Sequence, residues 1–321
     1  MNKLLTLIII ISSSILLTGC GSKNNSSGVA GTTFTDWKSL QSNQVINGIS
    51  VDITSPDEDT APTNNGFDTE ATAVIDTGDV DTGFTKISYT SNDNKTVFDV
   101  SDTGTSASDN ITVDGESYGY YTFTSDGDES PILITGIPQT TEGVWKYEYQ
   151  NYGAWVNFSM DGLSIGAMSA GAETPYSGLP ENGSATYVGE YTGVYINDAT
   201  NEDAITVGKV ALDANFTSRN IVFGTYDNYK KNLWQTPELN FVGASHLNIS
   251  GTLNFADETN LFSGSVTLDS DTGEVEDGVV KGQFYGPEAQ EVGGVFDISH
   301  TSAGDTELHI GSFGAIIQAT P

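Results

Sequence analysis

The segment GQFYGPEAQEVGGVF at residues 282–296 is the most informative stretch of this chain for its fold. Its aromatic, β-branched and glycine residues favour two extended strands joined by a short turn, which we expect at 278–286 and 291–300. Upstream residues behave alike, since side chains from 247 to 255 alternate between apolar and polar. That alternation is the pattern of a strand with one buried face. The segment therefore belongs to a run of β-strands.

The C-terminal half of the chain repeats this pattern from residue 184 onward. Eight candidate strands fit it, at 185–196, 204–216, 219–226, 246–256, 260–269, 278–286, 291–300 and 306–317. Their connections are short, as in hairpins, and glycines inside the strands permit tight bends. Eight consecutive strands in about 135 residues predict an antiparallel up-and-down β-barrel, and an all-β fold class.

The N-terminal half is expected to be a second β-rich part. Short β-like runs lie at 85–90, 96–100, 118–124, 145–149 and 154–160, and acidic loops lie at 55–66, 76–83 and 124–130. No convincing amphipathic helix interrupts this alternation of runs and loops. We therefore expect a β-rich domain at 34–180, followed by the barrel domain at 181–321.

The first 20 residues have the composition of a bacterial export signal. Lys3 provides a positive start, and the apolar run at 4–17 is shorter than a membrane-spanning helix requires. The sequence LTGC at 17–20 resembles the lipobox of bacterial lipoproteins. In that family the signal, here 1–19, is removed and the cysteine sulfur carries a diacylglycerol. Cys20 is therefore the expected lipidation site, detectable by palmitate labelling.

The residues after the lipobox extend this interpretation. Gly21 stands where inner-membrane lipoproteins of enterobacteria are associated with aspartate, so we expect a lipid anchor in the outer membrane. Residues 20–33 are rich in Gly, Ser and Asn, which is typical of a flexible tether. Cys20 is the only cysteine of the chain, so it can form no internal disulfide. Together these features predict a folded body exposed at the cell surface.

The charge of the chain argues against two classes of function. Asp and Glu number 43 and Lys and Arg number 11, which gives a net charge of -32 at pH 7. Nucleic-acid binding depends on cationic side chains that displace counterions from phosphates, and docking on anionic lipid has the same requirement. The acidic surface either keeps the protein soluble or attracts a basic partner, and both interpretations stay open.

The segment 282–296 resembles the signature of the barrel domain of transferrin-binding protein B and its relatives, G-x-F-[YF]-G-P-x-A-x-E-[VL]-G-G-x-F. Every fixed position of that signature is met. Residues 183–189 resemble the first barrel strand of the family and 211–216 the second, whereas 152–155 resemble the end of its smaller handle domain. The resemblance implies one lobe, made of a handle domain and an eight-stranded barrel. It implies that the signature residues build the barrel and do not contact a ligand.

The resemblance also implies a class of function. Family members are surface lipoproteins that capture host iron proteins, haemoglobin or haem, bind complement regulators, or aid colonisation. Full transferrin receptors have two such lobes, and this chain has room for one. We expect a non-enzymatic surface lipoprotein that binds a host or environmental macromolecule for iron or haem acquisition. Expected partners are that macromolecule, a TonB-dependent outer-membrane receptor and a surface-lipoprotein translocator.

Two alternatives to this function stay open. The first is a direct haem binder of the hemophilin type, in which haem would be the cofactor; otherwise no cofactor is expected. The second is an adhesin for host colonisation or complement evasion without metal cargo. The sequence alone does not choose among them.

Two motifs suggest chemistry that the surrounding residues do not support. Residues 162–166 match the G-x-S-x-G elbow of α/β-hydrolases around Ser164, but that elbow needs a strand-to-helix turn and a nearby histidine. Asp161-Gly162 is typical of a hairpin turn instead. Residues 269–277 alternate oxygen-bearing side chains, but the closing glutamate of an EF-hand is missing, so a solvated hairpin loop is expected. No catalytic residue and no metal site are predicted.

The three histidines of the chain form no close ligand pair in the sequence. His246 and His309 fall on the polar side of their predicted strands, so both are expected to face solvent.

Five residues are candidates for a partner-binding surface. Tyr118 and Tyr120 lie in a tyrosine-rich run on an acidic background, and tyrosine is favoured at recognition surfaces. The alternative for these two residues is ordinary packing on a sheet. Ile132, Leu133 and Ile134 lie between two prolines and form either a buried edge strand or an exposed apolar contact loop.

Overall fold

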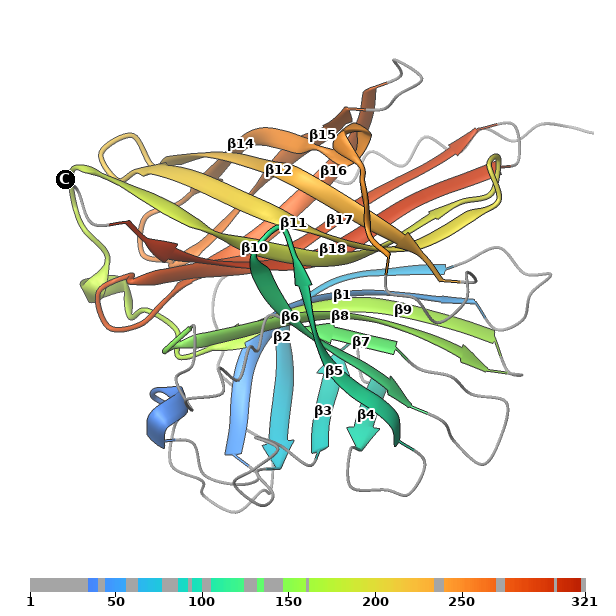
Figure 1. Ribbon diagram of the computed structural model, residues 1–321. Coiled ribbons are helices and arrows are strands. Elements are labelled where there is room, and N and C mark those ends of the chain that lie inside the picture. The colour runs from blue at the N-terminus through green and yellow to red at the C-terminus, as the bar shows by residue number, and fades with distance from the viewer. Residues whose placement is uncertain are drawn as a thin grey trace, which may run out of the picture. The chain divides into compact units, whose positions relative to one another are not determined.

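The computed structural model describes most of the chain after residue 33 (Figure 1). The described residues are 34–39, 44–55, 63–76, 86–91, 94–99, 105–123, 132–135, 147–159, 162–233, 240–269, 275–302 and 305–318. They belong to one compact unit, and they form two nine-stranded sheets. The predicted all-β fold class is confirmed. The predicted signal and tether, including Cys20, lie outside the described residues.

The C-terminal sheet closes into an eight-stranded antiparallel barrel. Its strands are β10 (Ser184–Asn197), β11 (Glu202–Asn215), β12 (Asn220–Asn232), β14 (Ile249–Phe255), β15 (Leu261–Asp269), β16 (Val275–Tyr285), β17 (Glu291–Ser302) and β18 (Asp305–Ile317). Each strand of the ring pairs with the next along the chain, and β18 pairs with β10 to close the ring. The short β13 (Val242–Gly243) pairs with β12. The predicted barrel is therefore confirmed.

One barrel strand is longer than the sequence pattern predicts. β12 continues beyond residue 226 to Asn232, because the pairing of β11 and β12 shifts register between Val207 and Lys209. A bulge of this kind reverses which residues face inward, so the apolar alternation ends while the strand continues. The predicted strand at 246–256 begins later, at Ile249, because Ser245–Leu247 form the 3-10 helix η3.

Aromatic side chains fill the barrel. Residues on alternate positions of every barrel strand share one buried cluster, as a closed sheet requires. The ring of Phe284 is central, with its centroid 5.5 Å from those of Phe255 and Phe262 and 5.7 Å from that of Phe216. Close edge-to-face contacts of this kind make the barrel interior a packed core.

The N-terminal sheet has the strand order β4-β3-β2-β1-β9-β8-β7-β6-β5. Its strands are β1 (Gln44–Ser55), β2 (Thr63–Asp76), β3 (Lys86–Ser91), β4 (Asn94–Asp99), β5 (Thr105–Val113), β6 (Glu116–Phe123), β7 (Ile132–Thr135), β8 (Gln150–Ser159) and β9 (Gly162–Gly171). All of its pairings are antiparallel. Four of the five runs predicted in this half appear as β3, β4, β6 and β8.

Two strand predictions for the N-terminal half are wrong, and the predicted loop at 55–66 overlaps a strand, because β2 begins at Thr63. The run at 145–149 is not a strand where it is described, because 147–149 form a bend that leads into β8. The backbone N–H groups of Glu148 and Tyr149 bind a barrel carboxylate there and join no ladder. β7 is a strand as one alternative predicted, but it is not an edge strand, since it pairs with β6 and with β8.

The central strands of the N-terminal sheet pack on the outside of the barrel. β1, β8 and β9 contact β10, β17 and β18 (Figure 1). A second apolar cluster lies between them, made of Ile49, Val51, Ile53, Ala154, Val156, Ile165, Ala167, Val194, Val295, Leu308 and Ile310. β10, β17 and β18 are therefore buried on both faces, by the barrel core and by the sheet.

The described helices are short. They are η1 (Trp37–Ser39), η2 (Tyr176–Gly178) and η3, each a single 3-10 turn. Within the described ranges, none has the length and apolar character that crossing a membrane would take.

Candidate functional site

The signature segment, residues 282–296, joins the barrel to the N-terminal sheet. Phe284 and Phe296 are fully buried in the barrel core. Tyr285 follows Phe284 and points the other way, and its hydroxyl lies 2.9 Å from Oγ of Ser169 in β9. The alternation of one strand therefore supplies both the barrel core and a contact to the sheet.

Glu291 of this segment holds the start of β8. Its carboxylate accepts hydrogen bonds from the backbone N–H groups of Glu148 at 2.6 Å, Tyr149 at 3.1 Å and Gln150 at 3.1 Å. Nε2 of Gln150 donates to the carbonyl of Val292 at 2.8 Å. Burial raises the pKa of Glu291 to about 7, although the three N–H donors oppose the shift. The signature glutamate is thus a buried acceptor inside the fold.

The two adjacent signature glycines allow close approach on opposite faces of β17. A Cβ on Gly293 would collide with Oε1 of Gln150 and Oγ of Ser169 in the N-terminal sheet. A Cβ on Gly294 would collide with the carbonyl of Lys281 across the barrel ladder. Gly293 therefore allows the N-terminal sheet to pack closely on β17, and Gly294 allows the neighbouring barrel strand to do so. Both serve architecture, as the resemblance implies.

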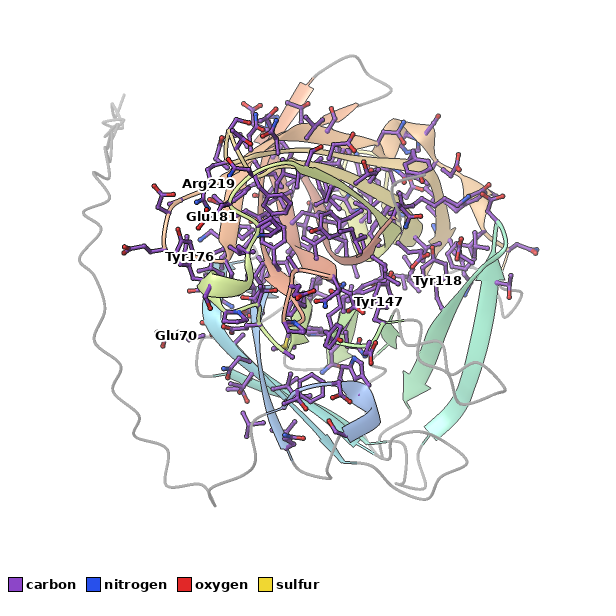
Figure 2. All side chains as sticks on the ribbon, turned by 90° about the vertical axis from the view of Figure 1, so that its left-hand side faces the viewer. Glu70, Tyr118, Tyr147, Tyr176, Glu181 and Arg219 are labelled. Atoms are coloured by element: carbon purple, nitrogen blue, oxygen red, sulfur yellow. The ribbon has the colours of Figure 1, made fainter. Side chains whose placement is uncertain are left out.

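Tyr118 and Tyr147 lie at the boundary between the barrel and the N-terminal sheet (Figure 2). The hydroxyl of Tyr147 lies 2.6 Å from Oε2 of Glu190 and 2.8 Å from the carbonyl oxygen of Gly314. The hydroxyl of Tyr118 donates to the carbonyl of Gly208 in β11 at 3.3 Å. Burial raises the pKa of both tyrosines well above the usual value. The hydroxyl groups of Tyr118 and Tyr147 thus form internal polar contacts with the barrel.

The structure therefore corrects the role expected of Tyr118. Its side chain is only 2% exposed and packs with Val113, Ile205 and Val207, so a partner cannot reach it. The tip of the β5–β6 hairpin lies on the barrel, and Lys209 of β11 binds Asp114 of that tip at 2.8 Å. The sequence gives no sign of this contact, because its two sides are about 90 residues apart.

The remaining predicted site residues are placed as follows. Tyr120 of β6 and Ile134 of β7 are cross-strand neighbours, and Ile132 and Leu133 pair with both β6 and β8. The structure thus brings these four residues together in one part of the sheet. Their role in partner binding stays a prediction, as does the lipidation of Cys20.

All three histidines gather at one end of the barrel. His309 lies on β18 opposite Tyr195 of β10, His300 lies on β17 opposite Glu307, and His246 lies in η3. The ring centroids of Tyr195 and His309 are 5.9 Å apart, and those of Tyr195 and His246 are 6.5 Å apart. The sequence could not show this grouping, because only the closure of the barrel brings these residues together.

The prediction that His309 faces solvent is wrong. Its side chain is fully buried, and its Nε2 lies 3.0 Å from Oγ1 of Thr206. Burial lowers the pKa of His309 to about 3, and the nearby His246 adds to the shift. The prediction failed because the polar phase of β18 is the inward phase at this end of the barrel. His246, also expected to face solvent, is half-buried.

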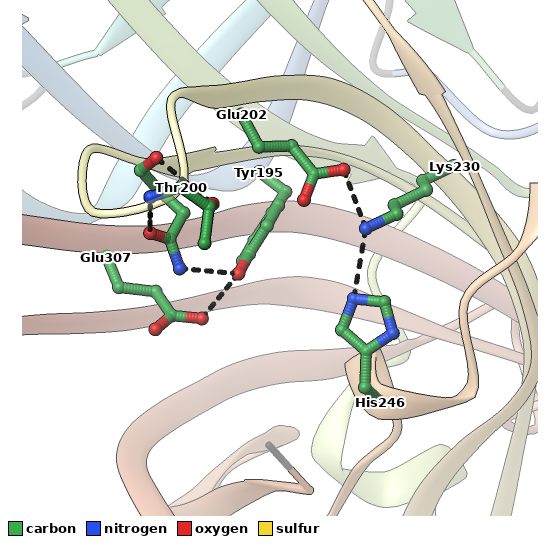
Figure 3. Close-up of polar contacts among 7 residues, drawn as sticks. Tyr195, Thr200, Glu202, Lys230, His246 and Glu307 are labelled. Atoms are coloured by element: carbon green, nitrogen blue, oxygen red, sulfur yellow. Dashed lines mark hydrogen bonds and ion pairs between the residues drawn. The ribbon is translucent and has the colours of Figure 1, made fainter. Parts of the chain in front are cut away.

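A polar network surrounds this end, which we call the barrel-mouth cluster (Figure 3). It consists of Tyr195, Thr200, Glu202, Lys230, His246 and Glu307, together with Asn197, which contacts Tyr195 and Thr200. Nζ of Lys230 lies 2.6 Å from Oε1 of Glu202 and 3.2 Å from Nε2 of His246. Because an ammonium group only donates, this imidazole nitrogen carries no proton in that contact.

The tyrosine of the barrel-mouth cluster completes the network. Tyr195 donates its hydroxyl proton to Oε1 of Glu307 at 2.6 Å and accepts a hydrogen bond from Nδ2 of Asn197 at 3.0 Å. Lys230 lies 5.9 Å from the centre of the Tyr195 ring, within the range of a cation–π contact. The cluster's polar groups therefore bind one another. Among the described side chains, no three His, Cys, Asp or Glu residues are arranged to hold a metal ion.

The two chemical motifs of the sequence have structural explanations. Ser164 lies inside β9, paired with Asn157 of β8 and Thr54 of β1, so the strand-to-helix turn of a hydrolase elbow does not form there. The predicted hairpin is confirmed by the pairing of Ser159 with Gly162. Segment 269–277 connects β15 and β16 as a hairpin, although 270–274 lie outside the described residues.

A pocket of about 570 Å³ lies beside β1, and we call it the β1 pocket. Its lining comes from the first described residues, from β1, from the segments that flank β8 and β9, and from the turn after β16. The lining residues are Phe34, Thr35, Asp36, Val45, Asn47, Tyr149, Gly171, Ala172, Glu173, Pro175, Gly286 and Pro287. The volume lies in the range of ligand-binding clefts. Gly286 and Pro287 belong to the signature segment, but no motif in the sequence marks the pocket as a whole.

Comparison with known protein families gives a match that covers the barrel. Residues 179–316 match the family described as the C-lobe and N-lobe β-barrels of transferrin-binding protein B. This range contains all eight barrel strands and the signature segment. None of the curated proteins matches this chain.

The solved structures that match this chain include a transferrin-binding protein B from Haemophilus parasuis, with a TM-score of 0.43 and 15% identity. The match covers 86% of this chain and 59% of that one. The isotype 1 protein from serogroup B Neisseria meningitidis gives a TM-score of 0.40 and 18% identity, over 86% of this chain and 44% of that one. This chain thus spans less than two thirds of these proteins. A surface lipoprotein structure gives a TM-score of 0.39 and 12% identity, over 84% of this chain and 98% of that one.

Proposed function

We propose that this chain belongs to the transferrin-binding protein B-like family and has a role in surface recognition, because its residues 179–316 match the barrel model of that family. In this role the chain is a lipid-anchored protein of the bacterial outer membrane. It binds a host or environmental protein, and the purpose of binding is the acquisition of iron or haem. The match of the barrel to this family model is the observation that carries this proposal.

The packing of the barrel supports recognition of a macromolecule over storage of a small ligand. Eight-stranded barrels either hold one small ligand or fill their interior with side chains. Here Tyr187, Tyr191, Phe284, Phe296 and Phe313 are fully buried in the core. Binding by the barrel domain is therefore expected at its outer surface and loops.

The N-terminal sequence supports the location. A lipid on Cys20 and the tether at 20–33 would hold the described body at the outer membrane. A surface-lipoprotein translocator would deliver the chain, and a TonB-dependent receptor would accept its cargo. These two partners follow from the family and are part of the proposal.

The first experiment is capture of a partner by the full-length, lipidated chain. Cells that express the chain are incubated with serum or with medium from the natural habitat, and bound proteins are identified by mass spectrometry. Growth on defined iron sources, with and without the gene, then tests whether the captured protein supplies iron. Capture without a growth difference would favour an adhesin, and failure to capture any protein would contradict the proposal.

Two controls separate the alternatives. Cys20→Ser should abolish palmitate labelling and release the chain from the membrane, while leaving the barrel folded. Titration with haem should give no saturable shift of the Soret band, because aromatic side chains fill the barrel interior. A saturable Soret shift would instead support the direct haem binder.

A further inference from the structure

One wall of the β1 pocket is an open strand edge. β1 pairs with β9 from Gly48 onward, whereas Val45 and Asn47 precede that ladder and pair with β2 alone among the described strands. The side chains of Val45 and Asn47 are exposed, and both line the pocket. An edge of this kind offers backbone N–H and C=O groups to an added strand.

The other walls of the pocket are largely apolar and are held in place by buried contacts. Phe34 and Tyr149 contribute aromatic rings, and Pro287 contributes an apolar surface. The ring of Phe34 lies 4.8 Å from that of Trp37, whose Nε1 donates to the carbonyl of Gln150 at 2.6 Å. The pocket is therefore formed before a ligand arrives, which lowers the entropic cost of binding.

The charges of the pocket select the chemistry of an occupant. Asp36 and Glu173 are acidic, and none of the described lining residues is basic. Asp36 accepts the backbone N–H of Ser39 at 2.9 Å, so its carboxylate is held at the pocket by η1. Glu173 is exposed to solvent, and no described cation lies within ion-pair distance of it. Desolvation by neighbouring groups raises the pKa of its carboxyl group. A cation in the pocket would be attracted by both carboxylates and could form a cation–π contact with an aromatic ring.

We propose that the β1 pocket binds an extended basic segment of the partner protein. The segment adds as a strand along Val45–Asn47, and it places a Lys or Arg side chain against Glu173 and Tyr149. This inference rests on the proposed function and names the chemistry of the partner. Strand addition supplies main-chain hydrogen bonds, while the pocket selects the side chain. The net charge of -32 attracts such a segment from a distance.

The test measures peptide binding by fluorescence anisotropy with the full chain. The probe is a labelled six-residue peptide of alternating Val and Arg, and the control peptide carries Gln in place of Arg. The variant is Glu173→Gln. Its matched control is Glu181→Gln, which removes the same charge from an exposed side chain outside the pocket lining (Figure 2).

We expect saturable binding of the Arg peptide that weakens as salt increases. Glu173→Gln should raise its Kd by about tenfold, whereas Glu181→Gln should change it by about twofold or less. The inference is overturned if the Arg peptide does not bind, if the Gln peptide binds equally well, or if both variants have the same Kd.

The captured partner separates failure of this inference from failure of the proposed function. Equal capture of the partner by the wild-type chain and by Glu173→Gln would contradict binding in the β1 pocket and would still support the proposed function. Binding of the Arg peptide as expected, without any partner captured from natural fluids, would support the pocket and contradict the function.

Discussion

Acidification tests the burial of His309, the residue for which prediction and structure differ most. Its folded pKa of about 3 lies below the ordinary value of 6.5. As the pH falls below 6.5, the unfolded chain binds a proton that the folded chain rejects, so stability is lost. One pKa unit corresponds to about 1.4 kcal/mol, so this group costs about 2 kcal/mol by pH 5 and about 3 kcal/mol by pH 4. The contribution is fully present only above the unfolded pKa.

The assay compares wild type with His309→Gln, which keeps a polar group near Thr206 but cannot titrate. Urea unfolding is followed by tryptophan fluorescence at pH 7, 6, 5 and 4. The unfolding free energies of wild type and variant at a single pH are not compared, because the exchange also alters packing. The pH slope isolates the titration, and wild type should lose about 3 kcal/mol more than the variant between pH 7 and 4.

A second measurement covers the case in which the variant does not fold. With three histidines in the chain, the imidazole signals in NMR spectra are few. The signal of His309 should stay that of a neutral imidazole in the folded protein at pH 5. Parallel stability curves for the two proteins, or a midpoint near 6.5 for His309, would show that the imidazole is not buried as described.

Three further predictions concern the signature segment. Gly293→Ala should lower the free energy of unfolding by about 1–3 kcal/mol, because the new Cβ meets Gln150, and thermal melts would measure the loss. Phe284→Ala should lower it by about 3–5 kcal/mol, since it empties the centre of the barrel core, as urea titration would show. For Glu291, the folded pKa of about 7 lies above the ordinary value of 4.5, so its contribution to stability is fully present below pH 4.5 and is lost as the pH rises through 7. In urea titrations, the unfolding free energy of wild type should therefore fall by about 3 kcal/mol between pH 4.5 and 9 because of this group. Glu291→Gln should not show this fall, because its side chain does not titrate.

Matched controls define what would contradict these three predictions. Gly243→Ala adds a methyl group where nothing lies within 4 Å, so it should leave the melting temperature unchanged. Val279→Ala shortens an exposed side chain of β16 and should cost far less than Phe284→Ala. Equal effects of a variant and its control would mean that the described contacts do not limit stability. For Glu291, a pH slope unchanged by the substitution would contradict its burial as a titrating group.

Local patterns account for much of the barrel. The period-two alternation at 247–255 and the signature at 282–296 locate strands and turns, because side chains of a strand alternate between its faces whatever the partner strand is. The lipobox at 17–20 and the acidic composition are likewise local properties. The role of the signature in joining the sheet to the barrel was invisible locally, since Gly293 and Glu291 act on residues of β8 and β9.

The errors share one physical cause. Alternation predicts which face of a strand is apolar on the assumption that the other face meets water. β18 violates that assumption, because His309 and Phe313 face the barrel core while Leu308 and Ile310 meet the N-terminal sheet. The prediction that Tyr118 lies on a partner-binding surface failed for a similar reason. Its neighbours in the sequence are polar, but the barrel covers its strand.

The amino-acid order thus determines the barrel strands and the family resemblance of the barrel, because these depend on side-chain periodicity and on residues adjacent in the chain. The positions of the functional groups depend on contacts between distant segments. Barrel closure brings His246, His300 and His309 to one end, and the meeting of β1 with the segment at 171–175 forms the β1 pocket. Such contacts form only when separate strands pack, so no single stretch of sequence carries them.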